Sequence, residues 1–174
     1  MEMQFLYFLQ SLRSPALDRI MTLVFSTIVG SKGEVWIWFG LSLLLFPKTR
    51  KSGLTVLASY ILAYYIGDGI LKDLIARPRP CTADPSVELL VARSNSYSCP
   101  SVHSMLAFAS ASAFSYDHGK TGVAVLIFAA LVAFSRLYFF VHYPTDVIFG
   151  AFLGAVIGCT VSAGCRKLTL RQNS

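Results

Sequence analysis

The chain has 174 residues, of which 55% are hydrophobic and 14% are charged, and its formal net charge is +6. Soluble domains usually carry about 25% charged residues, so this composition excludes an ordinary soluble fold and indicates an integral membrane protein. A basic balance in a membrane protein is typical of the charge bias that orients it in the bilayer. We therefore expect the bilayer, and no nucleic acid, as a partner.

The predicted elements begin with a short amphipathic helix over residues 1–14, which lies at the membrane surface and ends at Pro15. Two apolar segments follow, each shorter than the roughly 20 residues that a crossing helix needs. They predict a tight helical hairpin that either crosses the bilayer or partly re-enters it. These two segments cover residues 16–30 and 34–46, and four further spans cover 53–71, 101–116, 121–141 and 144–165.

The pattern of spans predicts an all-α integral membrane protein with about six transmembrane helices in one bundle, preceded by the interfacial helix. No repeat or linker divides residues 1–174, so we expect a single domain. Basic residues collect on the cytoplasmic side of membrane proteins, and they predict a cell-membrane protein with both termini in the cytoplasm. The inner segments then hold Arg13, Lys48, Arg50, Lys51, Lys120, Arg166, Lys167 and Arg171, and the outer segments hold Lys32, Lys72, Arg77, Arg79 and Arg93.

This arrangement brings polar side chains from distant segments to one membrane face. Lys72 and Arg79 follow the third span, and Ser101 and His103 begin the fourth. The stretch SRLYFFVHYPTD, residues 135–146, ends the fifth span and begins the sixth, and it carries Arg136, His142 and Asp146. Each residue taken separately has a structural interpretation, such as an interfacial anchor or a helix cap. Together they supply three cations, two imidazoles, a hydroxyl and a carboxylate.

That set of groups suits a phosphate ester. Three cations can neutralise phosphoryl oxygens, and the amino end of a helix adds free N–H groups. A histidine can attack phosphorus, a carboxylate can fix the tautomer of that histidine, and a second histidine can transfer the proton. The acidic residues are too scattered to hold magnesium. We therefore expect no metal and no other cofactor.

Three motifs carry a family resemblance. They are KDLIARPRP over residues 72–80, PSVH over 100–103, and SRLYFFVHYPTD over 135–146. In order and spacing they resemble the signature of the type 2 phosphatidic acid phosphatase superfamily, which also includes the vanadium-dependent haloperoxidases. Those haloperoxidases are soluble, and this chain is not. The resemblance runs from Lys72 to Asp146, and the surrounding spans are similar to those of the six-helix membrane members.

The resemblance implies a role for each matching residue. His142 would be the nucleophile, Asp146 its orienting partner, and His103 the general acid and then the general base. The groups that would bind the phosphoryl oxygens are Lys72, Arg79, Ser101, Val102 through its backbone, and Arg136. Val102 departs from the family pattern, because glycine is usual there. We expect its β-branched side chain to affect the shape of the substrate pocket rather than the chemistry.

The resemblance further implies a metal-independent phosphatase that hydrolyses a lipid phosphate or diphosphate at the outer membrane face through a phosphohistidine. Undecaprenyl diphosphate is the preferred substrate, and phosphatidylglycerophosphate or phosphatidic acid are the alternatives. A different class is a non-catalytic protein that binds or transports lipid phosphates. Such a protein needs the cations but neither His103 nor His142. The presence of both histidines favours the enzyme.

Several residues near the motifs leave two interpretations open. Cys81 and Cys99 directly adjoin the first two motifs, and they either form a disulfide or remain two thiols. Arg77 and Arg93 are either solvated loop charges or an outer ring that attracts an anionic headgroup. Asp68 lies four residues before Lys72 and is expected to pair with it.

Overall fold

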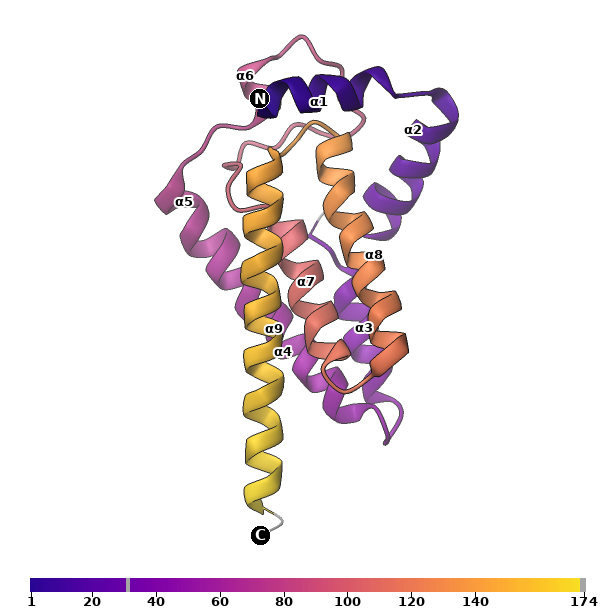
Figure 1. Cartoon of the computed structure of the whole chain (residues 1–174), viewed down its shortest axis with the longest axis vertical. Coiled ribbons are helices and arrows are strands. Elements are labelled where there is room, and N and C mark those ends of the chain that lie inside the picture. The colour runs from indigo at the N-terminus through magenta and orange to yellow at the C-terminus, as the bar shows by residue number, and fades with distance from the viewer. Residues whose placement is uncertain (31, 173–174) are drawn as a thin grey trace.

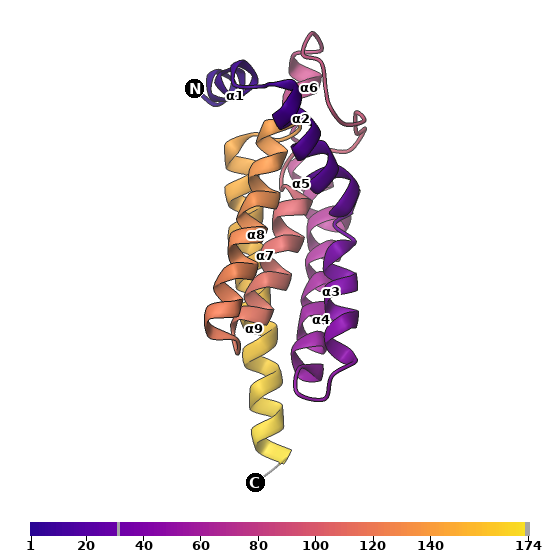
Figure 2. The same cartoon turned by 90° about the vertical axis from the view of Figure 1, so that its right-hand side faces the viewer.

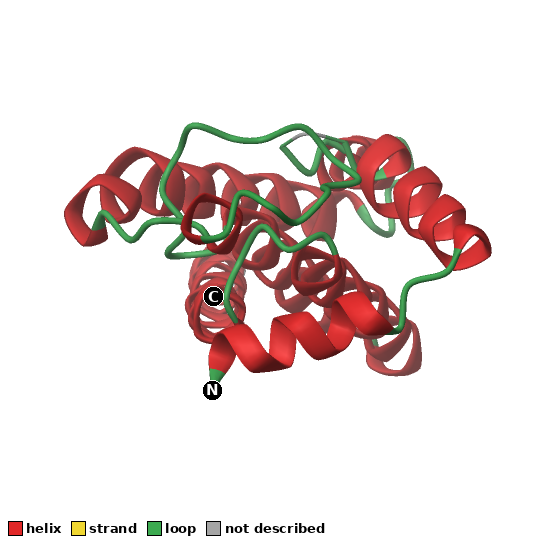
Figure 3. Ribbon diagram, turned by 90° about the horizontal axis from the view of Figure 1, so that it is seen from above, coloured by secondary structure: helices red, strands yellow, loops and turns green. Residues whose placement is uncertain are grey.

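The computed structural model describes residues 1–30 and 32–172, and within them all regular structure is helical (Figures 1 and 3). Two segments, η1 and η2, have the wider turns of a π-helix. The elements in chain order are α1 (Glu2–Ser11), α2 (Pro15–Met21), η1 (Thr22–Ile28), α3 (Val35–Leu44), α4 (Arg50–Ile66), η2 (Gly67–Leu71), α5 (Lys72–Ile75), α6 (Pro80–Ala83), α7 (Val102–Ser115), α8 (Gly119–Tyr138) and α9 (Pro144–Gln172).

Within the described residues, three stretches of helix are long and apolar enough to cross a membrane, and α3 is a shorter apolar helix. The three are Arg50–Ala83, Gly119–Tyr138 and Pro144–Leu168. Their outward surfaces carry large apolar side chains, as expected for helices that face lipid. This confirms an all-helical membrane protein, whereas the predicted number of six spans is not confirmed.

Helix α7 stands at the centre of the bundle and packs against α4, α8 and α9. Its contact with α9 is unusually close because three glycines, Gly150, Gly154 and Gly158, recur every four residues along one face of α9. A Cβ atom on Gly150 would lie 2.6 Å from the carbonyl oxygen of Ser101, and Cβ atoms on the other two glycines would also run into the α7 backbone. Small residues at this spacing let membrane helices approach closely. The start of α7 is thereby fixed beside the start of α9.

The first helices do not form the predicted hairpin, because they run along the bundle in a single direction. Asp18 in α2 accepts a hydrogen bond from Tyr138, at the end of the bundle that α1 covers, over 2.5 Å. Phe39 in α3 packs its ring on Phe114 near the opposite end of α7, with centroids 5.0 Å apart. Segments α2, η1 and α3 therefore descend along the bundle in one direction (Figures 1 and 2).

The reason lies in the break between η1 and α3. Gly30 and Gly33 both have positive φ, +83° and +70°, which only glycine adopts without steric cost. They let the chain bend without reversing its direction. Ser31, in the middle of the predicted turn, lies outside the described residues.

This path corrects the predicted placement of the termini. Within the described residues the chain runs the length of the bundle five times, along α2–η1–α3, α4–η2, α7, α8 and α9. Helix α1 lies across one end of the bundle, and the final turns of α9 lie at the other (Figures 1 and 3). The two termini are therefore at opposite ends, where the sequence predicted both on one side.

Candidate active site

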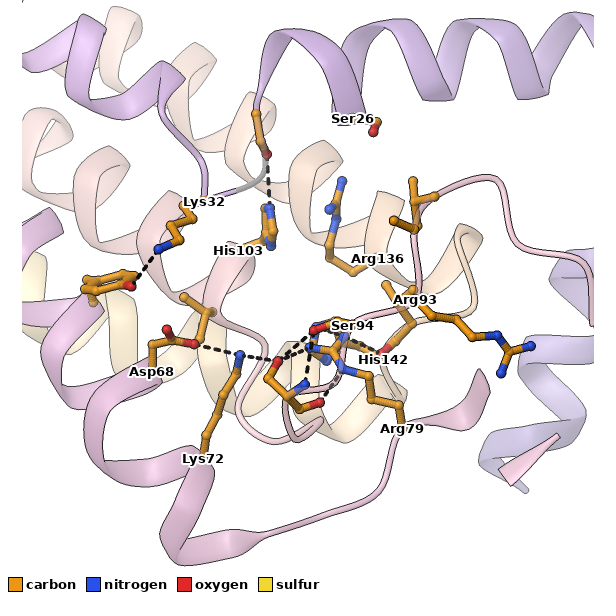
Figure 4. A pocket seen from close by; sticks show the side chains of 17 residues that line it. Ser26, Lys32, Asp68, Lys72, Arg79, Arg93, Ser94, His103, Arg136 and His142 are labelled. Carbon is orange, nitrogen blue, oxygen red and sulfur yellow. Dashed lines mark hydrogen bonds and ion pairs between the residues drawn. The ribbon is translucent and has the colours of Figure 1, made fainter. Parts of the chain in front are cut away.

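A cavity of about 460 Å³ is lined by residues near the end of the bundle that α1 covers, and Figure 4 shows this cavity from close by. Six of the eight predicted site residues line it: Lys72, Arg79, Val102, His103, Arg136 and His142. The chain brings them from η2–α5, the following loop, the start of α7, and the end of α8. Asp146 and Ser101, the other two, lie behind this lining. Further lining comes from Ser26, Gly30, Lys32, Tyr64, Asp68, Val141 and the loop residues 91–94 and 96.

His142 is placed by a tight turn that joins α8 to α9. Helix α8 ends at Tyr138, and Phe140 adopts a left-handed backbone with φ of 58°. The amide of Val141 then donates to the carbonyl of Arg136 over 3.2 Å, which closes the helix end in the manner of a Schellman motif. His142 follows this turn at once, so its side chain is 3% exposed and lines the cavity.

The contacts of His142 define which ring nitrogen carries the lone pair. Arg79 Nη1 lies 3.2 Å from His142 Nε2, and a guanidinium only donates hydrogen bonds. Nε2 is therefore the acceptor, and in the neutral ring the hydrogen sits on Nδ1, which faces Asp146 Oδ2 at 3.8 Å. Burial lowers the pKa of His142 to about 4. At neutral pH the ring is uncharged, with the Nε2 lone pair toward the cations.

The carboxylate of Asp146 is fully buried and held from three sides. Its Oδ2 accepts from the Tyr143 amide at 2.9 Å, in the manner of a capping box, and from Ser98 Oγ at 2.5 Å. Its Oδ1 accepts from Arg77 Nη1 at 2.6 Å. This contact differs from both interpretations that the sequence left open for Arg77, a solvated loop charge or part of an outer ring that attracts an anionic headgroup. Motif spacing does not predict the contact of Ser98, whose only sequence signal is its place two residues before the second motif.

Lys72 and Arg79 are joined through one serine. The ammonium of Lys72 contacts Asp68 Oδ1 at 2.8 Å, which confirms the expected pair, and Ser96 Oγ at 3.1 Å. Arg79 donates from Nη2 to the same hydroxyl at 3.0 Å and from Nε to the Ser96 carbonyl at 2.8 Å. Ser96 thus sets the spacing of the two cations. The sequence offered no signal for it beyond its loop position.

Arg136 reaches the opposite side of the cavity (Figure 4). Its Nη2 donates to the Phe25 carbonyl at 2.6 Å, and Nε donates to Ser135 Oγ at 3.0 Å. The Phe25 carbonyl lies in η1, where a wider turn of backbone offers an acceptor to this guanidinium. The guanidinium also lies 5.0 Å from the ring centre of Phe139, a favourable cation–π distance.

The start of α7 presents His103 and Val102 to the cavity. His103 Nε2 lies 3.2 Å from the carbonyl oxygen of Gly30, and because a carbonyl only accepts, this nitrogen carries a hydrogen. Ser101 contributes differently from the prediction. Its hydroxyl accepts from Ser104 at 2.9 Å and does not line the cavity, while its amide donates to the Asp146 carbonyl at 3.0 Å. The side chain is diverted because the close contact with α9 buries Ser101 completely.

Cys81 and Cys99 are both free thiols and do not form the disulfide that was the other interpretation of these residues. Cys81 is buried beneath the loop, and burial raises the pKa of Cys99 to about 11. Arg93 does line the cavity, but its guanidinium donates to the carbonyls of Cys81 and Pro85 at 2.5 and 2.9 Å. It ties down the loop while the residue remains exposed.

The cavity carries a strong excess of positive charge. Among the described residues that line it, Asp68 is the one carboxylate, against Lys32, Lys72, Arg79, Arg93 and Arg136. A cavity with this charge and a neutral imidazole at its wall can bind an anion with several oxygens. The described residues contain no group of three or more His, Cys, Asp or Glu placed to hold a metal ion. The absence of a metal requirement stays a prediction.

Comparison with known proteins agrees with the motif pattern. An undecaprenyl-diphosphatase of Sulfolobus acidocaldarius is 36% identical over 71% of this chain and 60% of its own length. The bacitracin transport permease protein BcrC of Bacillus licheniformis is 32% identical over 75% of this chain and 65% of its own. The chain thus spans about three fifths of these relatives.

A solved structure provides a match over almost the whole chain. It is that of a transmembrane PAP2 type phosphatidylglycerolphosphate phosphatase from Bacillus subtilis, with a TM-score of 0.78 and 27% identity, covering 95% of this chain and 85% of that one. The sequence model of the PAP2 superfamily matches residues 52–169, a stretch that includes all three motifs. The chain belongs to the PAP2 superfamily.

Proposed function

We propose that the protein is a lipid phosphatase that works through a phosphohistidine on His142. The observation that carries this proposal is the pairing of His142 with Arg79 at one nitrogen and with Asp146 at the other. A phosphoryl group bound to the surrounding cations would meet the Nε2 lone pair directly. The membrane location and the phosphatase relatives support a lipid as the carrier of that phosphoryl group.

The reaction proceeds in two steps. Nε2 of His142 attacks phosphorus, and the bond between phosphorus and the leaving oxygen breaks while protonated His103 gives that oxygen a proton. Asp146 stabilises the positive charge that develops on the imidazole ring. Water then attacks the phosphohistidine, His103 takes its proton, and inorganic phosphate leaves. The cations Lys72, Arg79 and Arg136 offset the charge of the phosphoryl oxygens throughout.

A polyprenyl diphosphate such as undecaprenyl diphosphate is the substrate that we favour. Two observations support it: the identity to the Sulfolobus undecaprenyl-diphosphatase, and the five cations that line the cavity. The motif cations suffice for one phosphate group, and Lys32 adds charge for a second. Phosphatidylglycerophosphate is the second candidate, supported by the Bacillus subtilis structure.

A transport or binding protein is the rival from another class, and the name of the BcrC relative is that of a permease. Binding alone would require the cations but no oriented nucleophile. The Arg79–His142–Asp146 arrangement, with the second imidazole of His103 at the same cavity, favours catalysis.

We propose that the site opens at the outer membrane face. Seven basic residues lie toward the end of the bundle opposite α1: Lys48, Arg50, Lys51, Lys120, Arg166, Lys167 and Arg171. At the site end, Arg13 pairs with Asp18, and Arg77 pairs with Glu2 and Asp146. Because Lys72, Arg79 and Arg136 are buried at the cavity and Arg13 and Arg77 pair with carboxylates, solvated basic residues are more numerous at the far end, which favours a cytoplasmic far end. In this orientation the carboxyl terminus is cytoplasmic and the amino terminus lies outside with the site.

The deciding experiment measures phosphate release by the full chain in detergent, with and without EDTA. The panel is undecaprenyl diphosphate, phosphatidylglycerophosphate, phosphatidic acid and a short soluble phosphate ester. We expect lipid substrates to be hydrolysed at a rate that EDTA does not change, and His142→Ala to lose activity. His118→Ala is the matched control, because this histidine stacks on Phe114 at the far end of the bundle. Turnover that persists in His142→Ala would disprove the nucleophile.

A further inference from the structure

The amino-terminal helix reaches the catalytic carboxylate through one arginine. Arg77 donates from Nη1 to Asp146 Oδ1 at 2.6 Å and from Nη2 to Glu2 Oε2 at 2.7 Å. Glu2 in turn accepts from the amide and the hydroxyl of Thr145, at 3.1 and 2.7 Å. The Arg77 guanidinium also lies 3.9 Å from the ring centre of Tyr143. These contacts form a continuous chain from α1, through the loop after α5, to the first turn of α9.

These contacts restrain the Asp146 carboxylate. The other oxygen of Asp146 is already held by Ser98 and by the Tyr143 amide. With Arg77 on Oδ1, both oxygens have partners, and the carboxylate cannot rotate away from His142 without breaking a charge-assisted bond. Glu2 supplies an acceptor for the Thr145 amide, one of the N–H groups that the start of a helix leaves without an intrahelical partner.

Helix α1 is docked firmly enough to act through this chain of contacts. Leu6 and Leu9 are 0% and 6% exposed, and they join an apolar cluster with side chains from α8 and α9. Gln10 donates to the Tyr138 carbonyl at 3.0 Å. Arg77 is therefore clamped between a packed helix on one side and the site on the other, and its side chain is 28% exposed.

We propose that Arg77 and Glu2 are positioning residues for Asp146, so that docking of α1 sets the orientation of the His142–Asp146 pair. This inference rests on the proposed phosphatase function. Neither residue lines the cavity, so neither touches the substrate. Their contribution should therefore affect the chemical step and leave substrate binding almost unchanged.

The test compares Arg77→Gln, Arg77→Lys and Glu2→Gln with the wild-type chain, using phosphate release from farnesyl diphosphate in detergent. For Arg77→Gln we expect kcat to fall at least about 10-fold, which corresponds to about 1.4 kcal/mol, with KM within about two-fold. Arg77→Lys should restore part of kcat, because one ammonium can still pair with Asp146. The Glu2→Gln/Arg77→Gln double variant should lose no more than Arg77→Gln alone, since Glu2 reaches Asp146 through Arg77 and the glutamine oxygen can still accept from Thr145.

Arg13→Gln is the matched control. It removes an ion pair of similar exposure, with Asp18, at the same end of the bundle, and Arg13 makes no contact with Asp146. Thermal unfolding of each variant in the same detergent separates lost stability from lost positioning. Equal kcat values for Arg77→Gln and Arg13→Gln would overturn the proposal, as would a rise in KM with kcat unchanged.

A second measurement does not depend on turnover. The chain has three histidines, so selective isotope labelling lets NMR follow the titration of His142. Loss of Arg77 should let the Asp146 carboxylate turn away from the ring and so move the pKa of His142 downward by about one unit, because the protonated imidazole then loses its anionic partner. The charged and titratable groups that act on His142 are Arg79, Lys72, His103 and Asp146, and none is changed.

The two measurements distinguish a failure of the proposed phosphatase function from a failure of the proposed positioning role. A wild-type chain that releases no phosphate from the diphosphate or from the lipid panel would count against the proposed function. An unchanged His142 titration in Arg77→Gln would count against the positioning role, whatever the wild-type activity. A downward shift with Arg13→Gln unshifted supports the positioning role even in that first case, whereas an upward shift would report only the lost cation and would count against it.

Discussion

Replacing Gly150 by alanine tests whether the distance between α7 and α9 sets the geometry of the site. A Cβ atom at this position would lie 2.6 Å from the carbonyl oxygen of Ser101, and ordinary contact begins at 3.4 Å, so the backbones must move apart by about 0.8 Å. Asp146 lies one turn before Gly150, and His103 lies two residues after Ser101. A misplacement of about 1 Å costs about 100-fold in rate, so we expect kcat to fall by about 10-fold to about 100-fold.

Stability should change less than activity in this variant. Overpacking costs about 1–3 kcal/mol, and the better helix propensity of alanine offsets about 1 kcal/mol of that cost. Gly164→Ala is the matched control on the same helix, because a Cβ atom there would have no neighbour within 4 Å. Thermal unfolding and phosphate release are measured for both variants in one detergent. Wild-type kcat in Gly150→Ala would refute the idea that this helix contact positions the site.

Four further results are expected. Arg79→Lys should lower kcat/KM by about 100-fold, because an ammonium cannot reproduce the forked contacts of this guanidinium. Lys32→Ala should raise KM more for a diphosphate than for a monophosphate lipid, as measured by phosphate release. The pH dependence of kcat/KM reports the pKa values of the free enzyme, and the pKa of His142 is about 4. Protonation of His142 should therefore not lower kcat/KM between pH 7 and pH 5, and kcat/KM should fall as the pH drops below 4. Alkylation of the unreduced, denatured chain should label both Cys81 and Cys99, as mass spectrometry will show.

The sequence was sufficient to predict the long apolar helices and six of the residues that line the site. Long apolar runs predict α4, α8 and α9 because only a helix satisfies its own backbone in lipid. The motif spacing predicted that Lys72 and His142 would meet at one cavity, which they do. The pairing of Asp68 with Lys72 also followed from the spacing of four residues on a helix.

Motif spacing could not predict the contacts that depend on tertiary packing. Arg77 stands out of register with the family pattern, and its contact with Asp146 requires the loop after α5 to fold back on the start of α9. The hydroxyl of Ser101 turns away from the cavity because the close approach of α9 encloses it. Ser96 and Ser98 lie in a loop whose path no periodicity encodes, yet they hold the cations and the carboxylate.

The direction of the first helices depends on a feature that hydropathy does not contain. Two short apolar segments with a polar break fit a hairpin and a single interrupted crossing equally well, and the positive φ angles of Gly30 and Gly33 decide for the second. The interruption also supplies the site with a backbone carbonyl and a side chain that an unbroken helix would not place there. It frees the Gly30 carbonyl to accept from His103 and places Lys32 at the cavity. Irregular backbone at membrane depth is tolerated where it lines a polar cavity, so the shortness of these two segments is itself a consequence of the site that they help to build.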